Sequence, residues 1–344
     1  MYIYGTGGLR ILPAADSDAI LIAIRKFVKS DYSKFMFEDE WANILPINLE
    51  ATYDWISIQQ LSLIAEDYDA TLPVQYYSDE LDTYQYGILD MGGESIEIAY
   101  LTTTQTTTQT TSYYEPIHSD LFNKDHLNLY VSGFEHLGHR DAYNNHLLNI
   151  ILDPPSTDGK YYSPCLLSGS NTIVKYTNNT STTVYGSGSA SECVTQVNRL
   201  INKPGCAFDS CSIGGAFYPN NDVFISTIFS FTFLFSLRSF FFLFHIKNQL
   251  FVAFSNYAET AEFFNMEDQF ELLELFENVT EYCQITQSQA KLLYPSIPSS
   301  TLSRYCFDGV YSYQILTYGY FSLLFSSFCR ETQFSIYLKV RIQS

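Results

Sequence analysis

Hydrophobic positions repeat with two different periods along the chain. In Ala15–Ser30 and Trp55–Ala65 the apolar residues recur every three to four positions, which predicts two amphipathic helices. The first segment has aspartates near its start and Arg and Lys near its end, the charge order that the helix dipole favours. Tyr86–Tyr100 ("YGILDMGGESIEIAY") instead holds two short apolar runs on either side of Gly92 and Gly93, which predicts a β-hairpin.

The second half of the chain adds more helical patterns. They cover Asp141–Ile151, a segment that begins near Ser191, and Glu259–Tyr282. Between the hairpin and the first of these lies a Thr/Gln tract, "LTTTQTTTQTTS", for which we expect a solvated loop or an extended hairpin. Helices mixed with strands predict an α/β fold, and 344 residues are enough for one large or two medium domains.

Two regions depart from this pattern. Val223–Ile246 is almost continuously apolar and rich in Phe, and it is long enough to cross a bilayer, although Arg238 lies inside it. A membrane anchor is therefore one interpretation of this segment. The start of the chain, "MYIYGTGGLRIL", contains neither the basic region nor the apolar region of a signal peptide.

The charge balance limits the kinds of partner. The chain has 18 Lys and Arg residues against 37 Asp and Glu residues, so its formal net charge is −19. We expect no nucleic-acid partner, because contacts with a nucleic-acid backbone need basic surface. A small phosphate ligand held by backbone N–H groups and a divalent cation is compatible with this charge.

Cysteines and glycosylation sequons bear on the compartment. All seven cysteines lie in the second half and none forms a CxxC pair, which argues against a zinc ribbon. Asn178, Asn179 and Asn278 each begin an Asn-X-Ser/Thr sequon. Together these features favour an oxidising compartment.

The predicted hairpin turn carries the residue types of a phosphate site. A Gly-Gly turn between strands exposes successive backbone N–H groups to an anion, and glycine lets a phosphate approach the backbone closely. Asp90 ends the first strand and is suited to hold a metal directly or through water. Ser95 opens the second strand and is suited to orient a water molecule. An ordinary glycine hairpin is the alternative.

Other candidate residues are ambiguous when they are taken singly. Gly5–Arg10 ("GTGGLR") is a second glycine turn, but it lacks the Lys-Ser/Thr of a P-loop. Glu50 lies just before the helix predicted at Trp55, where a carboxylate usually serves the helix dipole. His136 and His139 do not form an HExxH motif, so solvated or packing roles are favoured over a metal site.

Taken in order, these segments resemble the sequence blocks of the nucleoside triphosphate diphosphohydrolases, the apyrase family. "GTGGLRIL" is similar to the family's "ATAGMRLL", "NLEATYDWISIQQL" to "EEGxYGWIxxNYL", and "GILDMGGESIEIAY" to "LDLGGASTQI". Further along, "SPCLLSG", "CAFDSCSIGGAFYP", "LFVAFSNYAETAEFF" and "YCFDGVYSYQILTYGYF" resemble later blocks of the family. The order of the blocks is kept from the first glycine turn to the end of the last block, which makes the resemblance specific.

The resemblance implies an actin-like α/β fold, in which two RNase-H-like domains enclose a nucleotide. It implies a partial N-terminal domain over residues 1–85 and a C-terminal domain over residues 86–325, with an anomalous Phe-rich insert at 223–246 and an anomalous tail at 326–344. The family's "DAGSSGT"-like phosphate loop is not found, so the first domain is expected to be incomplete. This polypeptide is therefore expected to hydrolyse little ATP or ADP by itself.

The resemblance also implies an activity and its residues. The family removes terminal phosphates from nucleoside tri- and diphosphates by attack of water, with Ca²⁺ or Mg²⁺. Glu50 corresponds to the catalytic base, and Ser95 to the hydroxyl that orients the water. Asp90 corresponds to the carboxylate that acts on the metal through its water shell. Gly92 and Gly93 correspond to the turn that cradles the phosphate.

Further binding residues follow from the same resemblance. Thr6 and Gly8 fall in the block that lines the phosphate end of the cleft. Tyr305 corresponds to an aromatic residue that stacks on the nucleotide base, and Phe254 or Tyr257 is a candidate for the opposite face of the base.

The family's disulfides imply three pairings and a location. The pairs are Cys165–Cys193, Cys206–Cys211 and Cys283–Cys306, which leave Cys329 over. The implied location is extracellular, at the cell surface or in the lumen of the secretory pathway.

The chain departs from the family blocks near the proposed base. Ala51 replaces the glycine after the base, and Glu97 replaces a glutamine. Because a glutamate at this position is typical of the related exopolyphosphatases, an exopolyphosphatase-like hydrolase is one alternative. A non-catalytic nucleotide-binding protein tethered to a membrane through Val223–Ile246 is another.

Overall fold

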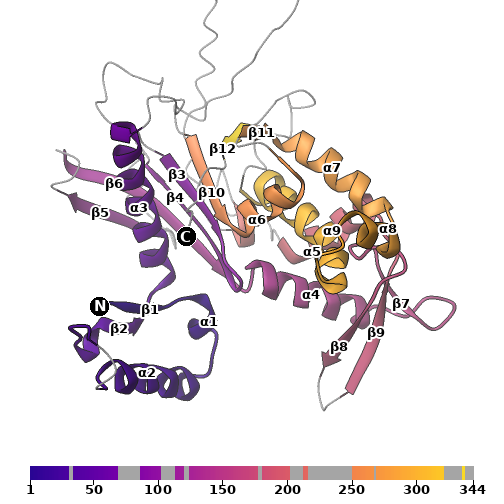
Figure 1. Ribbon diagram of the computed structural model, residues 1–344, viewed down its shortest axis with the longest axis horizontal. Helices are drawn as coiled ribbons and strands as arrows, with labels where there is room; N and C mark the ends of the chain where they lie inside the picture. The colour runs from indigo at the N-terminus through magenta and orange to yellow at the C-terminus, as the bar shows by residue number, and fades with distance from the viewer. Residues whose placement is uncertain are drawn as a thin grey trace, which may run out of the picture. The chain divides into compact units, whose positions relative to one another are not determined.

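The computed structural model divides the chain into two compact units. It describes residues 1–30, 34–68, 86–101, 113–119, 124–176, 180–201, 212–215, 250–266, 269–320 and 335–337. Unit 1 comprises Met1–Leu101 and Ser112–Ala142, and unit 2 comprises Thr102–Thr111 and Tyr143–Ser344. Figure 1 labels the helices and strands of both units.

Unit 1 combines helices with two sheets. Its elements in chain order are β1 (Ile3–Gly5), α1 (Gly7–Arg10), α2 (Ala14–Val28), η1 (Asp39–Trp41), β2 (Ala42–Ile44), α3 (Ile47–Tyr68), β3 (Tyr86–Met91), β4 (Ser95–Leu101), β5 (Tyr113–Ser119) and β6 (Lys124–Glu135). Strands β1 and β2 form a short parallel pair. Strands β3, β4, β6 and β5 are successive antiparallel neighbours.

The predicted hairpin at Tyr86–Tyr100 is confirmed by β3 and β4. In their register Asp90 lies opposite Glu97. Almost every residue of both strands is buried. Burial on both faces of the sheet explains why these strands read as nearly continuous apolar runs and not as a polar–apolar alternation.

Helix α3 packs against β3, β4 and β6 (Figure 1). Its Ala51 and Trp55 are fully buried. The prediction that this helix begins at Trp55 is wrong, because the structure begins it at Ile47. Ala51 and Trp55 lie one turn apart on the same face, so packing on the sheet continues the helix toward its start. Glu50 therefore lies in the first turn of α3 and not before the helix.

Unit 2 combines short strands with a group of helices, and its first helix, α4, starts in the last residues of unit 1. The elements in chain order are α4 (His139–Leu152), β7 (Tyr161–Ser163), β8 (Asn171–Tyr176), β9 (Thr180–Gly186), α5 (Ala190–Ile201), η3 (Ile213–Gly215), β10 (Leu250–Ser255), α6 (Asn256–Phe263), β11 (Gln269–Glu271), α7 (Leu272–Gln284), α8 (Gln287–Leu293), α9 (Ser299–Gln314), η4 (Ile315–Tyr320) and β12 (Ser335–Tyr337). Strand β9 lies between β7 and β8, and β12 pairs with β10 and β11. Helix α9 packs against α5, α6, α7 and α8.

Most of the helical predictions agree with these elements. Helices α2, α4 and α5 confirm the predictions at Ala15–Ser30, at Asp141–Ile151 and near Ser191. The prediction of one helix over Glu259–Tyr282 is wrong, since α6 and α7 are separated by β11. Asn265 follows α6 with a φ of 54°, a left-handed conformation that cannot continue a right-handed helix.

Two of the three implied disulfides are present in unit 2. Cys165 and Cys193 are joined with their Cα atoms 4.8 Å apart, and Cys283 and Cys306 with theirs 5.0 Å apart. The first bond ties the segment after β7 to α5, and the second ties α7 to α9. The pair Cys206–Cys211 lies outside the described residues.

Some predictions concern segments beyond the described structure. Val223–Ile246 lies outside the described residues, as does the tail 326–344 apart from β12. Among the helices that the structure does describe, none combines the length and the apolar character needed to cross a bilayer. The boundary between the compact units lies after Ala142. The family resemblance instead implies a domain boundary after residue 85, and the predicted domain boundaries remain a prediction.

Gly138 allows the segment before α4 to approach the hairpin turn. A Cβ atom at this position would lie 2.3 Å from the backbone nitrogens of Glu94 and Ser95. We expect Gly138→Ala to lower the free energy of unfolding by about 1–3 kcal/mol, because backbone atoms must move to admit the methyl group. Chemical denaturation followed by circular dichroism measures this difference.

Gly8→Ala is the matched control for Gly138→Ala. A Cβ at Gly8 has no heavy atom within 4 Å, so this variant is expected to stay within about 0.5 kcal/mol of the parent protein. Equal stability of the two variants would contradict the close packing of Gly138.

Candidate functional site

Arg10, at the end of α1, connects two of the predicted catalytic residues of unit 1. Its side chain is only 8% exposed. Nη1 donates to Oε2 of Glu50 at 2.5 Å and to the carbonyl of Leu45 at 2.9 Å. Nη2 donates to Oγ of Ser95 at 3.0 Å. The structure therefore brings Glu50 and Ser95 to opposite sides of one guanidinium group.

Two further glutamates share the charge of Arg10. Its Nε donates to Glu135 at 2.9 Å, and Nη2 lies 3.6 Å from Oε1 of Glu97. A guanidinium with its planar set of five N–H donors can serve this many acceptors at once, which an ammonium cannot. The N–H groups of Arg10 are thus directed at three carboxylates, one hydroxyl and one backbone carbonyl of the site.

The first glycine turn packs against the hairpin turn. A Cβ atom added to Gly7 would lie 2.9 Å from Oγ of Ser95 and 3.1 Å from Cβ of Glu94. Thr6 lies at the start of α1, and its carbonyl accepts the backbone N–H groups of Leu9 and Arg10. The two turns that the sequence picked out separately are therefore neighbours.

The hairpin turn is also bonded to the start of α4. The carbonyl of Gly92 accepts the N–H of His139 at 2.9 Å. The carbonyl of Gly93 accepts the N–H groups of Arg140 at 2.8 Å and Asp141 at 3.1 Å. Neither glycine has a positive φ, so the turn lacks the left-handed residue of an anion nest. Phosphate binding by Gly92 and Gly93 stays a prediction.

Carboxylates gather on the side of the site formed by α3 and the hairpin. Glu50 and Asp54 lie one turn apart on α3, and Asp90 and Glu97 face each other across β3 and β4. Burial, and then the charges of Asp90 and Glu50, raise the pKa of Asp54 to about 7. The same three causes, in the same order, raise the pKa of Glu97 well above its usual range.

This arrangement fits a divalent cation that keeps its water shell. Oδ2 of Asp54 and both oxygens of Glu97 are buried and accept no hydrogen bond within the described structure. The described residues contain no group of three His, Cys, Asp or Glu side chains placed to ligate one ion directly. A hydrated Mg²⁺ needs only one or two carboxylates from the protein, whereas Ca²⁺ takes more oxygen ligands.

Tyr305 belongs to α9 of unit 2 and stacks on Phe263. The two ring centroids are 3.4 Å apart and the ring planes differ by 6°. Phe264 meets the edge of Tyr305, with the centroids 6.5 Å apart. Tyr257, a predicted candidate for the opposite face of the nucleotide base, is almost completely buried, and the assignment of Phe254 stays a prediction. The residue stacked on Tyr305 is thus Phe263, which the sequence analysis missed.

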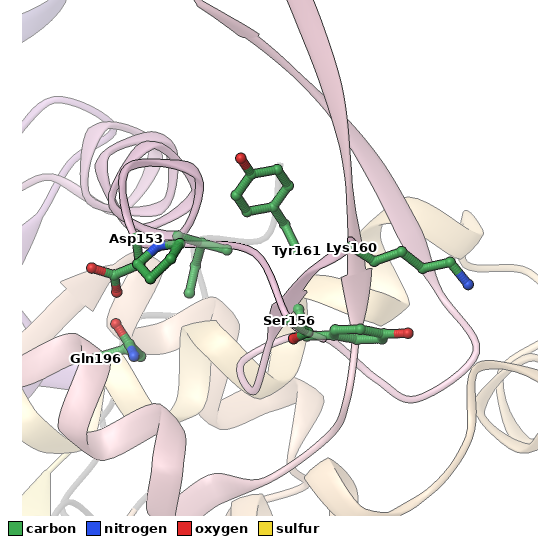
Figure 2. Close-up of a pocket in the computed structure, with 8 residues that line it drawn as sticks. Asp153, Ser156, Lys160, Tyr161 and Gln196 are labelled. Carbon is green, nitrogen blue, oxygen red and sulfur yellow. The ribbon is translucent and has the colours of Figure 1, made fainter. Parts of the chain in front are cut away.

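A shallow polar pocket in unit 2 has none of the predicted site residues in its wall. It is lined by Ile150, Asp153, Pro154, Ser156, Lys160, Tyr161, Tyr162 and Gln196. Asp153 is bonded to Arg199 at 2.8 Å. Figure 2 shows Lys160 extending away from Asp153 and Gln196, so these charged groups do not converge on a ligand. We assign this pocket no role.

The geometry of unit 1 can be compared with known proteins. The model of the GDA1/CD39 (nucleoside phosphatase) family matches residues 1–328, and the chain therefore belongs to this family. It is 24% identical over 324 residues to a probable apyrase 3 of Arabidopsis thaliana, covering 91% of this chain and 58% of that protein. It is 24% identical over 344 residues to ectonucleoside triphosphate diphosphohydrolase 1 of Bos taurus, covering 93% of this chain and 60% of that protein. The chain thus spans about three fifths of the length of these relatives.

A solved structure supports the fold. The nucleoside triphosphate hydrolase structure from Neospora caninum superposes with a TM-score of 0.59 at 13% identity, covering 92% of this chain and 65% of that one. The predicted actin-like α/β class is confirmed by this similarity and by the mixed sheets and helices of both units.

The predicted site residues divide between the two units. Unit 1 holds Thr6, Gly8, Glu50, Asp90, Gly92, Gly93 and Ser95, and unit 2 holds Tyr305. Arg10 and Asp54 were missed as site residues. Asp54 could have been found, because it lies four residues after Glu50 and so shares its helix face.

Asp54 gives a test of the electrostatics of this site through the pH dependence of stability. Its pKa rises from 3.8 to about 7 on folding, so between these pH values the folded protein keeps a proton that the unfolded chain has lost. The free energy of unfolding is therefore expected to fall as pH rises from about 4 to about 7. Asp54→Asn is expected to remove at least about 1 kcal/mol of this fall.

Urea denaturation of metal-free protein at a series of pH values measures how steeply the free energy of unfolding falls with pH. The raised pKa of Glu97 also makes the free energy of unfolding fall as pH rises, so part of the pH dependence is expected to remain in Asp54→Asn. If Asp54→Asn keeps the whole slope of the parent protein, the carboxyl of Asp54 titrates as it does in water and this account of the site is wrong.

Proposed function

We propose that the protein is a phosphohydrolase that removes terminal phosphates from nucleoside tri- and diphosphates, with unit 1 carrying its hydrolytic residues, and that this polypeptide by itself does so only slowly. The observation that carries this proposal is the bonding of Arg10 to both Glu50 and Ser95. Membership of the nucleoside phosphatase family supports the reaction class. The names of the relatives, an apyrase and an ectonucleoside triphosphate diphosphohydrolase, support nucleotides as substrates.

In this proposal Glu50 is the general base and Ser95 positions the water. Arg10 donates to Oε2 of Glu50, so Oε1 is the oxygen proposed to take the proton from the water. Arg10 also donates to Oγ of Ser95, which fixes the position of the hydroxyl oxygen. Arg10 is thus a positioning residue that holds the carboxylate of Glu50 and the hydroxyl of Ser95 at a fixed distance from each other.

The phosphate end of the substrate is proposed to lie against the two glycine turns. Gly92, Gly93, Thr6 and Gly8 would contact phosphate oxygens, and Gly8 has open space beside its Cα atom. Asp90 would hold Ca²⁺ or Mg²⁺ through water. When bound, such an ion offsets negative charge on the phosphates.

The base end of the substrate is proposed to stack on Tyr305. One face of this ring is already covered by Phe263, so the base would take the other face or separate the two rings. Either arrangement favours a flat aromatic base over a chain of phosphates alone.

The proposed location is extracellular or in the lumen of the secretory pathway. The disulfides Cys165–Cys193 and Cys283–Cys306 in unit 2 support an oxidising compartment. The name of the bovine relative, an ectoenzyme, points the same way.

Glu50→Gln tests the proposed base. This variant keeps the shape of the side chain but cannot accept a proton, so kcat for phosphate release from ATP and ADP is expected to fall about 10²–10⁴-fold. Phosphate release in the presence of Ca²⁺ or Mg²⁺ measures the effect. Glu38→Gln, an exposed glutamate, is the matched control and is expected to keep full activity. Unchanged turnover in Glu50→Gln would exclude Glu50 as the base.

Tyr305→Ala separates a nucleotide hydrolase from a polyphosphate hydrolase. Loss of a stacking ring is expected to raise KM for ATP about tenfold while leaving hydrolysis of inorganic tripolyphosphate unchanged. Equal effects on both substrates, with tripolyphosphate preferred by the parent protein, would favour the exopolyphosphatase-like alternative. Binding of ATP without any turnover would favour the non-catalytic alternative.

A further inference from the structure

Two carboxylates of the site have no part in the proposed reaction. Asp54 and Glu97 are additional to the proposed base, Glu50, and to Asp90. The similar family blocks have a glycine where this chain has Asp54 and a glutamine where it has Glu97. This chain therefore places two more ionisable carboxyl groups at the site than those blocks do.

The backbone holds these two carboxylates close to Asp90. Glu97 is directly opposite Asp90 in the antiparallel register, where facing side chains have their Cβ atoms about 4.5–5.5 Å apart. Asp54 lies on α3, which packs on the same two strands, and the charge of Asp90 acts on it more strongly than that of Glu50. The three carboxylates therefore repel one another.

The described cations compensate the carboxylates of Asp54 and Glu97 only weakly. Arg10 contacts Glu97 only at 3.6 Å, while its shorter bonds go to Glu50 and Glu135. Asp54 enters no ion pair in the described structure, and its Oδ2 is buried without a hydrogen bond. The side chain of Glu97 is 1% exposed, and both of its oxygens are buried without a hydrogen bond in the described structure. Buried carboxylate oxygens of this kind need a cation or a proton.

We propose that Asp54 and Glu97 extend the cation site at Asp90, so that the protein binds a hydrated divalent cation of the Mg²⁺ type before any nucleotide arrives. The inference rests on the proposed function in assigning Asp90 to the metal. The three carboxylates contact the ion through its water shell, which agrees with their not forming a close set of direct ligands. Their mutual repulsion is relieved when the ion binds.

Titration calorimetry with MgCl₂ alone, on the purified metal-free protein, tests this proposal. Asp54→Asn and Glu97→Gln keep the side-chain shapes and each remove one carboxyl group that can ionise when the cation binds. We expect each variant to weaken Mg²⁺ binding about tenfold or more, the range seen when residues that support a metal site are changed. Glu38→Gln removes one exposed charge elsewhere and is expected to bind Mg²⁺ as the parent protein does.

Thermal unfolding gives a second readout that does not depend on turnover. In EDTA both site variants are expected to unfold at a higher temperature than the parent protein, because each lacks one carboxyl group that folding buries beside other acids. Mg²⁺ is expected to raise the Tm of the parent protein more than that of either variant.

Three outcomes would overturn the inference. They are parental Mg²⁺ affinity in both variants, no Mg²⁺ binding by the parent protein without nucleotide, and a lower Tm of both variants in EDTA. None of these measurements involves nucleotide or Glu50, so failure here is distinguishable from failure of the proposed hydrolysis. Loss of ATP turnover in Glu50→Gln with normal Mg²⁺ binding would leave both proposals in place.

Discussion

Arg10 provides a buried positive charge at the point where four segments of unit 1 meet. Its guanidinium bonds to the segment before α3 through Leu45, to α3 through Glu50, to β4 through Ser95 and to β6 through Glu135. A buried ion is costly unless its hydrogen-bonding capacity is met, and here each partner meets part of it. The carboxylates in turn need the cation, so loss of Arg10 would leave buried acids without their partner.

The elements that hold these groups are regular and well packed. Ser95 and Glu97 stand on a strand that is buried on both faces, and Glu50 stands in the first turn of a helix whose Trp55 is fixed in the core. Side chains on such elements keep their positions better than those on loops. The proposed proton transfer to Glu50 depends on distances within a hydrogen bond, which regular elements keep constant better than loops do.

Much of the fold could be predicted from the sequence, because its signals are local. The two-strand pattern around Gly92 and Gly93 predicted the hairpin, and periodicity predicted α2, α4 and α5. The early start of α3 was missed because it depends on burial of Ala51 against a sheet that lies later in the chain. The break between α6 and α7 was missed although Asn265, which follows α6 in a left-handed conformation, is of a residue type that commonly ends helices.

The site was predictable only in part for a similar reason. Glu50, Asp90 and Ser95 were predicted through ordered blocks that resemble a family, and the structure links Glu50 to Ser95 through Arg10. Arg10 was overlooked because nothing in "GTGGLR" shows that its side chain is buried among acids from other segments. Phe263 was overlooked because its stacking on Tyr305 joins α6 to α9, a contact between residues far apart in the chain.

The bonds between the glycine turn and helix α4 have a mechanical consequence. Three consecutive amides of the helix are held by two neighbouring carbonyls of the turn, and Gly138 leaves no gap for slippage between them. Within unit 1, the first residues of α4 and the hairpin turn therefore fix each other's peptide orientations. The carbonyls of Gly92 and Gly93 are occupied by these bonds, which leaves their N–H groups as the polar backbone atoms that a ligand of the turn would use.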